Sequence, residues 1–295
     1  MTFKKDVIIV GAGPAGLITA IQLNRFDISC LIVEKNSIGG LLKNANQVEN
    51  YLGFPEGISG NALIELFKKH ISKNDIQIIF EGAVNLDFQE GKFLITTKNY
   101  CLESEIAVIA TGTKAKEIKN LTENQKAQNR IFYEVYKIQN AESKKIAIIG
   151  AGDAAFDYAL NLSRQNNVTI FNCKDQEKCL PVLKKRVEEN QNIQYLKNRI
   201  LEKVKFENAK LELGFLCTEK VETYSFNYLL LAIGRKPELS FLGKKINKQL
   251  ELLIDDKKLF LVGDVKNKRY RQLSIAAGDG MRVAMEINDT LTRYR

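Results

Sequence analysis

Histidine occurs only once in this chain of 295 residues, and the cysteines are few and scattered. His70 follows Lys68 and Lys69 in a helical pattern, which is typical of an exposed helix residue rather than a general base. Zinc sites and hydrolytic triads depend on histidine or on clustered cysteine. We therefore expect neither a metal held by the protein nor a Ser-His-Asp triad.

The sequence contains no Cys-x-x-Cys pair, the spacing of metal knuckles and of local redox dithiols. An odd number of cysteines in a chain without export features indicates free thiols. The five are Cys30, Cys101, Cys173, Cys179 and Cys217.

Long apolar runs are also absent, since none approaches the ~20 residues that a helix needs to span a bilayer. The first strand is predicted within a few residues of Met1, which leaves no room for a signal peptide. We therefore expect a cytoplasmic protein that does not insert into membranes.

Positive charge is in excess, because 44 Lys and Arg oppose 35 Asp and Glu and leave a net charge of +9. This charge suits an acidic partner, although a solvated surface explains much of it equally well. The basic residues are scattered and no nucleic-acid recognition module is visible. Binding to nucleic acid is therefore not expected.

The most informative stretch is 6–34, which predicts a strand, a tight turn, a helix and a second strand. Within GAGPAG, Gly11 permits the turn, Gly13 admits a pyrophosphate and Gly16 lets the helix pack on the strand. The helix N-terminus points its free N–H groups at the phosphates. Glu34 ends the second strand about 20 residues on, where a ribose hydroxyl needs an acceptor. Together these features predict a dinucleotide site.

The same strand–turn–helix unit recurs at 146–162, which matches 7–23 position by position. Gly150, Gly152 and Ala155 take the places of the three glycines of the first turn. Two such turns predict two nucleotide sites in one chain.

Hydrophobic periodicity distinguishes helices from strands elsewhere in the chain. Apolar strands followed by glycine turns and helices are typical of an α/β fold. The expected helices are 61–72 and 273–291, and the expected strands are 76–80, 84–88, 92–97, 105–110, 168–171, 228–233 and 259–262.

In these motifs the chain resembles the low-molecular-weight thioredoxin reductases and the ferredoxin–NADP reductases built on the same scaffold. The resemblance covers almost the entire length and rests on segments that occur in the same order. They are GAGPAG at 11–16, Glu34, Gly39-Gly40, ENYLGFPEGISG at 49–60, ATG at 110–112, the second fingerprint at 150–155, Gly263-Asp264 and RQLSIAAGDG at 271–280.

The resemblance implies an α/β fold with two Rossmann-like, three-layer ββα domains, as in class II pyridine nucleotide-disulfide oxidoreductases. Residues 1–115 and 240–295 would form a discontinuous FAD-binding domain, and 116–239 an inserted NAD(P)H-binding domain. FAD would be the cofactor and NADPH or NADH the co-substrate. The expected assembly is a homodimer.

The resemblance also implies which residues hold the two nucleotides. Asp264 would hold the ribityl chain of FAD, and the helix that opens near Gln272 would point its N–H dipole at the flavin pyrimidine edge, which favours the reduced form. The predicted FAD residues are Gly11, Gly13, Pro14, Ala15, Gly16, Glu34, Lys35, Gly40, Leu41, Asn50, Val84, Ala110, Thr111, Gly112, Gly263, Asp264, Arg271, Gln272 and Leu273. The predicted NAD(P)H residues are Gly150, Gly152, Asp153, Ala154, Lys174, Lys178, Gly234 and Arg235.

Three features depart from these families. Thioredoxin reductases carry Cys-x-x-Cys at a fixed distance before the second glycine turn, where this chain has Tyr133 and Tyr136. Relatives specific for NADPH carry His-Arg-Arg and a further Arg where this chain has Asn172-Cys173-Lys174 and Lys178. Lysines attract a 2′-phosphate as point charges without the fork of arginine, and no acid is placed to prefer NADH. The tail that covers the flavin in ferredoxin reductases is also missing before Arg295.

These observations favour a FAD-dependent NAD(P)H oxidoreductase that passes electrons to an acidic carrier, ferredoxin or flavodoxin, without a redox-active disulfide. Hydride transfer needs no side-chain acid or base, so no catalytic residue is predicted. The densest basic segments, 184–186 and 266–271, are the candidate docking patches. One alternative is a thioredoxin-reductase-like flavoprotein that reduces a quinone or a low-molecular-weight disulfide. Another is a flavin-bearing protein that no longer uses NAD(P)H.

Overall fold

The computed structural model describes residues 2–217 and 220–293 of the chain. The chain divides into two compact units, of which the first combines Met1–Lys43, Glu49–Lys114 and Lys236–Arg295. The second unit combines Asn44–Val48 with Ala115–Arg235. Each unit is built around one glycine-turn motif, and the two are described separately below.

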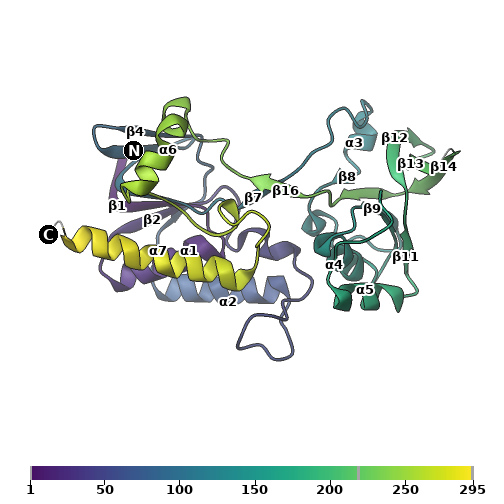
Figure 1. Ribbon diagram of the computed structural model, residues 1–295, viewed down its shortest axis with the longest axis horizontal. Coiled ribbons are helices and arrows are strands. Elements are labelled where there is room, and N and C mark those ends of the chain that lie inside the picture. The colour runs from purple at the N-terminus through teal and green to yellow at the C-terminus, as the bar shows by residue number, and fades with distance from the viewer. Residues whose placement is uncertain (1, 218–219, 294–295) are drawn as a thin grey trace. The chain divides into compact units, whose positions relative to one another are not determined.

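The first unit is a sheet with helices packed against it (Figure 1). Its hydrogen-bonded order is β3-β2-β1-β6-β5-β4, with β17 paired to β6. The strands are β1 (Thr2–Val10), β2 (Cys30–Val33), β3 (Ile78–Ile79), β4 (Asn85–Gln89), β5 (Lys92–Thr96), β6 (Cys101–Ile109) and β17 (Leu259–Leu261). The helices are α1 (Pro14–Arg25), α2 (Gly60–Lys73), α6 (Lys244–Asp255) and α7 (Leu273–Arg293), with the short 3-10 turns η1 (Gly40–Asn44) and η3 (Gly263–Val265).

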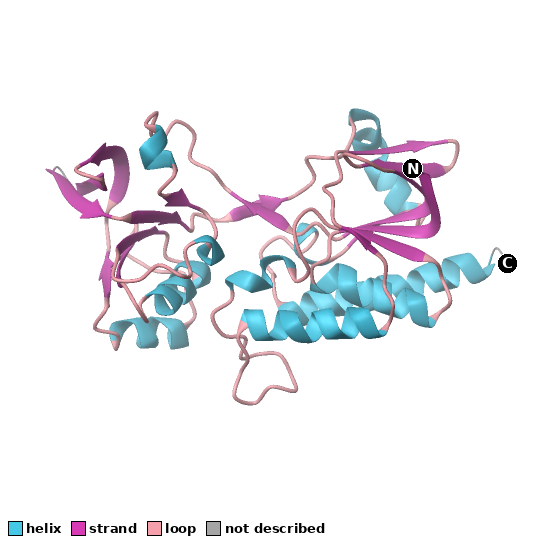
Figure 2. Cartoon of the chain, turned by 180° about the vertical axis from the view of Figure 1, so that it is seen from behind, coloured by secondary structure: helices cyan, strands magenta, loops and turns pink. Residues whose placement is uncertain are grey.

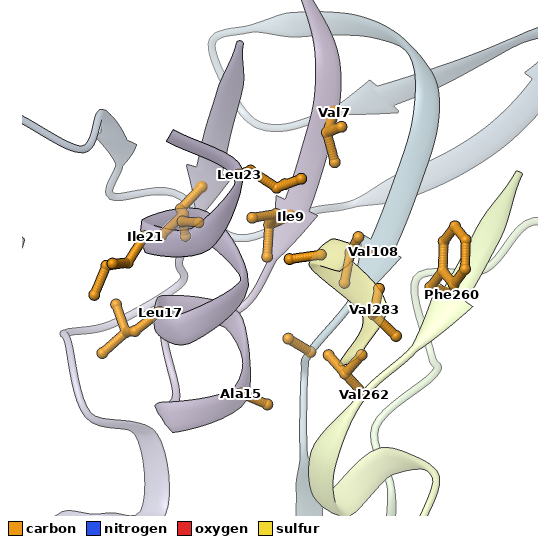
Figure 3. Packing of buried hydrophobic residues seen from close by; sticks show 14 of the residues in the cluster. Val7, Ile9, Ala15, Leu17, Ile21, Leu23, Val108, Phe260, Val262 and Val283 are labelled. Atoms are coloured by element: carbon orange, nitrogen blue, oxygen red, sulfur yellow. The ribbon is translucent and has the colours of Figure 1, made fainter. Parts of the chain in front are cut away.

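The central strand β1 is apolar on both faces, and its alternate residues enter two different cores. Val7 and Ile9 pack beneath α1 and α7 together with Val283, as Figure 3 shows. Ile8 and Val10 face the opposite core, which includes residues of α6. A strand buried on both faces explains why its sequence is continuously apolar rather than alternating.

The second unit has three layers. A five-stranded sheet in the order β11-β10-β9-β15-β8 lies between the helices and a three-stranded antiparallel sheet, β12-β13-β14. The strands are β8 (Ile131–Phe132), β9 (Lys145–Ile149), β10 (Asn167–Phe171), β11 (Ile193–Leu196), β12 (Ile200–Glu207), β13 (Lys210–Cys217), β14 (Lys220–Phe226) and β15 (Tyr228–Leu231). The helical segments are α3 (Gln125–Gln128), η2 (Val135–Lys137), α4 (Asp153–Leu162) and α5 (Pro181–Glu188).

Strand β9 repeats the two-sided burial of β1. Ile146 and Ile148 pack against α4 and α5, whereas Ala147 and Ile149 pack against β13 of the three-stranded sheet. Figure 2 shows these layers from behind, with helices in cyan and strands in magenta. The second unit therefore has the ββα layering expected of a Rossmann-like domain.

Two chain passages connect the units, and they pair with each other as strands β7 (Thr113–Ala115) and β16 (Arg235–Pro237). Residues 236–239, which were expected in the inserted domain, begin the last segment of the first unit. Glu238 accounts for this, because its carbonyl accepts a hydrogen bond from Thr111 Oγ1 (2.6 Å) and its carboxylate pairs with Lys114 (3.1 Å). Within 2–217 and 220–293, no helix is long and apolar enough to cross a bilayer.

Candidate functional site

The first glycine turn is closely packed on one side and open on the other. Gly11 has φ +114°, and a Cβ built there would lie 2.4 Å from the Ala110 carbonyl oxygen. A Cβ on Gly16 would lie 2.1 Å from the Gly11 carbonyl oxygen, so the turn and α1 are in direct backbone contact. A Cβ on Gly13 would meet nothing within 4 Å. The open side at Gly13 is the side on which a pyrophosphate approaches such a turn.

Glu34 is fixed beside this turn at the end of β2. Its side chain is buried, and one carboxylate oxygen accepts the Ala12 N–H at 2.8 Å. The other oxygen accepts the Asn36 N–H, also at 2.8 Å. Each carboxylate oxygen has a further lone pair, so Glu34 can still accept a hydroxyl of a bound ribose.

Other predicted FAD residues gather around the start of α1. The Gly39 N–H donates to the Ala12 carbonyl (2.8 Å), and a Cβ on Gly40 would lie 3.3 Å from the Gly13 Cα. Gly263, at φ +72°, brings η3 so close that its Cβ would lie 2.9 Å from that of Ala15. All nineteen residues predicted to hold FAD lie in the first unit.

Several of these residues have no recorded contact with the turn itself. Asn50 lies in an exposed loop but reaches the start of α7, where its amide donates to the Gln272 side chain at 3.0 Å. Val84 is 66% exposed. The Arg271 guanidinium donates to the carbonyl of Lys268 in its own loop.

Asp279 is a site residue that sequence reasoning missed. Its carboxylate, in the second turn of α7, accepts the Gly263 N–H at 3.1 Å and a hydrogen bond from the Asn267 amide. It therefore fixes the segment that carries Asp264. The only sequence signal was its place within the AAGDG segment, which matches the reductases but indicates no role for the aspartate.

The second glycine turn repeats the geometry of the first. Gly150, at φ +134°, would place a Cβ 2.4 Å from the Ala232 carbonyl oxygen, as Gly11 does against Ala110. At Gly152 the nearest atom to a Cβ is the Lys178 carbonyl oxygen at 4.0 Å, so this side is open. All eight residues predicted to hold NAD(P)H lie in the second unit.

Asn172 occupies the position in the second unit that Glu34 holds in the first. The Gly11 N–H donates to the last residue of β2, and the Gly150 N–H donates to the last residue of β10, immediately before Asn172. The Asn172 amide donates to the Gln176 carbonyl (3.0 Å) and to the Tyr195 hydroxyl (2.9 Å). A neutral side chain turned into its own loop thus replaces the carboxylate.

The YEVY segment contains a buried charge pair. Glu134, between the two tyrosines, pairs with Arg235 at 2.8 Å, and both side chains are 16% exposed. The Asn44 amide donates to the same carboxylate. Arg235, a predicted NAD(P)H residue, is therefore already bound by an acid of its own unit. Burial and the neighbouring Glu134 carboxylate raise the pKa of Tyr158.

The cysteines are thiols rather than disulfides, and two of them are poor nucleophiles. Burial raises the pKa of Cys30 to about 11. Burial, followed by the charges of Glu177 and Asp153, also raises the pKa of Cys179. Since the thiolate is the reactive form, neither thiol is activated for disulfide exchange.

Residues 5–280 match the pattern of the pyridine nucleotide-disulphide oxidoreductases. The chain belongs to this family. It is 27% identical to the thioredoxin reductase of Chlamydia pneumoniae, over 95% of this chain and 96% of that protein. It is 29% identical to the thioredoxin reductase of Pneumocystis carinii, over 93% of this chain and 92% of that protein. The fold is shared with the crystal structure of Lactococcus lactis thioredoxin reductase, which has a TM-score of 0.87, 24% identity and coverage of 98% and 99%.

This oxidoreductase is therefore a flavin-dependent enzyme of the thioredoxin-reductase type, and the cofactors of that type are FAD and NADPH. The first unit fits FAD, because it combines an open glycine turn with a buried acid beside it. The second unit has the open turn without the acid. When bound, FAD supplies hydride acceptance and electron release, while the protein binds and orients it.

Proposed function

We propose that this enzyme passes electrons from NAD(P)H through FAD to an acidic one-electron carrier of the ferredoxin or flavodoxin class, without a redox-active disulfide. The observation that carries the proposal is the pair Tyr133 and Tyr136 at the positions of the dithiol. The curated relatives are thioredoxin reductases. A protein without the dithiol needs an acceptor that takes electrons directly from the flavin, and flavins can release electrons one at a time.

We propose further that the first unit binds FAD and the second binds the nicotinamide nucleotide. Gly13 and Glu34 support the first assignment, because they offer an open turn and a buried ribose acceptor. Gly152 supports the second. The roles of Asp264 and of the α7 N-terminus rest on the family resemblance.

The surface charges favour one docking patch over the other. On α5, Lys184 pairs with Glu177 at 2.5 Å and Lys185 lies 3.9 Å from Glu189, so acids offset this patch. In the loop before α7, three exposed basic residues lie close together in sequence: Lys266, Lys268 and Arg269. We therefore place carrier docking at the loop 266–271.

The proposal is tested by reversing the charge of this loop. In Lys266→Glu/Lys268→Glu/Arg269→Glu, we expect slower reduction of ferredoxin or flavodoxin, and in the wild type a rate that falls as salt shortens the ~10 Å Debye length of 0.1 M solutions. Flavin reduction by NAD(P)H, followed by stopped-flow bleaching, should stay nearly unchanged. The matched control reverses three exposed lysines of α6: Lys244, Lys245 and Lys248.

The outcomes separate the alternatives. Equal carrier rates in both triple variants, with a flat salt profile, would exclude electrostatic docking at this loop and favour a quinone or a low-molecular-weight disulfide. A flavin that neither NADPH nor NADH bleaches, although dithionite does, would indicate a flavoprotein that does not use NAD(P)H.

A further inference from the structure

The loop 172–180, between β10 and α5, is fixed against the second glycine turn. The Lys178 N–H donates to the Ala151 carbonyl at 2.7 Å, and the Leu180 N–H donates to the Asp153 carboxylate, also at 2.7 Å. At the start of the loop, the Arg199 N–H donates to the Asn172 carbonyl at 2.9 Å. The side chains of this loop are thus held where the fold places the adenosine end of a dinucleotide.

A chain of hydrogen bonds connects Asn172 to an acid within this loop. Tyr195 on β11 accepts from the Asn172 amide at 2.9 Å and donates to the Glu177 carboxylate at 3.4 Å. Glu177 therefore stands near the position where a ribose acid is missing. Its side chain is 15% exposed, so it is largely enclosed by its partners.

Glu177 binds two lysines that lie outside the loop. Lys184 on α5 is 2.5 Å from one carboxylate oxygen, and Lys197 is 3.9 Å from the other. The hydrogen bond from Lys184 lowers the pKa of Glu177, and the same contact raises the pKa of Lys184. The two ammonium groups thus have a carboxylate partner, although their side chains are 39% and 43% exposed and open to a ligand.

We propose that Glu177 determines the coenzyme preference of this enzyme by binding Lys184 and Lys197 and thereby withholding them from the 2′-phosphate of NADPH. The inference rests on the proposed function of the second unit, in that this unit must bind a nicotinamide nucleotide. Lys174 and Lys178 remain as exposed cations, so discrimination between NADPH and NADH is weak. The position of Glu177 makes it a negative determinant, because its charge also opposes a phosphate dianion.

The test is the full-length variant Glu177→Gln, with binding of 2′,5′-ADP and 5′-AMP measured by titration calorimetry. Only 2′,5′-ADP carries the 2′-phosphate. We expect its affinity to rise about threefold to tenfold, since each partly exposed ion pair changes binding by about a factor of five or less. The affinity for 5′-AMP should not change. In steady state the NADPH:NADH ratio of kcat/KM should rise by the same factor, through KM rather than kcat.

Glu188→Gln is the matched control, because Glu188 also faces Lys184, at 3.9 Å, but lies a helical turn further along α5 and is 58% exposed. It should leave both affinities unchanged. Adding Lys184→Gln to Glu177→Gln should remove most of the gain, which shows that the freed lysine causes it. Circular dichroism and flavin content verify that each variant folds.

An unchanged affinity for 2′,5′-ADP in folded Glu177→Gln would overturn the inference, as would a wild type that already prefers NADPH by more than about a hundredfold. Either result leaves the proposed function intact if both nucleotides bleach the flavin. Wild-type protein that binds neither nucleotide would instead overturn the proposed function, and the inference with it.

Discussion

At the scale of single residues, the glycines of the first turn serve two different purposes. Gly11 and Gly16 are required by the protein itself, because any side chain there would collide with backbone atoms at 2.4 Å and 2.1 Å. Gly13 has open space around its missing Cβ. A glycine that the fold does not require is explained by a ligand that approaches its backbone closely.

The first prediction follows from this difference. Gly13→Val should fold with nearly unchanged stability but bind FAD weakly, because the valine occupies the path of the pyrophosphate. The control Gly16→Val should instead lose about 1–3 kcal/mol or more of stability through overpacking. Flavin absorbance per chain and thermal unfolding of both variants measure the two effects. A Gly13→Val protein that retains a full complement of FAD would contradict the assignment of this turn.

Sequence reasoning succeeded for residues whose function depends on local order. The glycines and Glu34 are placed by the strand–turn–helix pattern alone, and the structure brings them together as expected. The network around Glu177 could not be predicted, because its partners Tyr195 and Lys197 come from β11 and the connection after it. Such contacts depend on which strand pairs with β10.

At the scale of elements, the closest helix pair in the first unit is α1 with α7. A Cβ on Gly280 would lie 2.3 Å from the Ala15 carbonyl oxygen, and the Thr19 hydroxyl lies 3.2 Å from the Gly280 carbonyl oxygen. This contact joins the helix that opens at the first glycine turn to the C-terminal helix. Figure 1 shows the two helices side by side beneath the sheet.

The second prediction concerns this helix contact. Gly280→Ala should destabilise the protein by about 1–3 kcal/mol, because the added methyl group forces the backbones of α1 and α7 apart. Gly278→Ala is the control within the same helix, since its Cβ meets nothing within 4 Å. This substitution should stabilise by about 0.5–1 kcal/mol through helix propensity. Chemical denaturation measures both, and equal effects of the two changes would contradict the close packing.

Elements with a clear period were predicted well. The helix expected over 61–72 is Gly60–Lys73, and its start is fixed by Ser59, whose hydroxyl accepts the Ala62 N–H at 3.2 Å. The strand expected over 76–80 is reduced to Ile78–Ile79, which pairs only with β2 at the edge of the sheet. The sheet β12-β13-β14 was not predicted, because β12 buries few residues and a register shift between Leu201 and Lys203 interrupts its alternation.

At the scale of the whole molecule, the repeated motif organises each unit separately. The segment Asn44–Val48 belongs to the second unit although the first unit surrounds it in sequence. Its contacts explain this, since Asn44 donates to Glu134 and the Asn46 N–H donates to Asp157 at 3.0 Å. No local pattern indicates such an exchange, because its cause is hydrogen bonding to residues about a hundred positions away.

The central claim is that electrons leave this enzyme through the flavin without a cysteine pair. The most direct measurement is NADPH- or NADH-driven reduction of ferredoxin or flavodoxin by the wild type and by a variant with all five cysteines changed to serine. Because Tyr133 and Tyr136 replace the dithiol, we predict equal carrier reduction rates and no reduction of thioredoxin by either protein. Thioredoxin reduction that disappears when one cysteine pair is removed would contradict the claim.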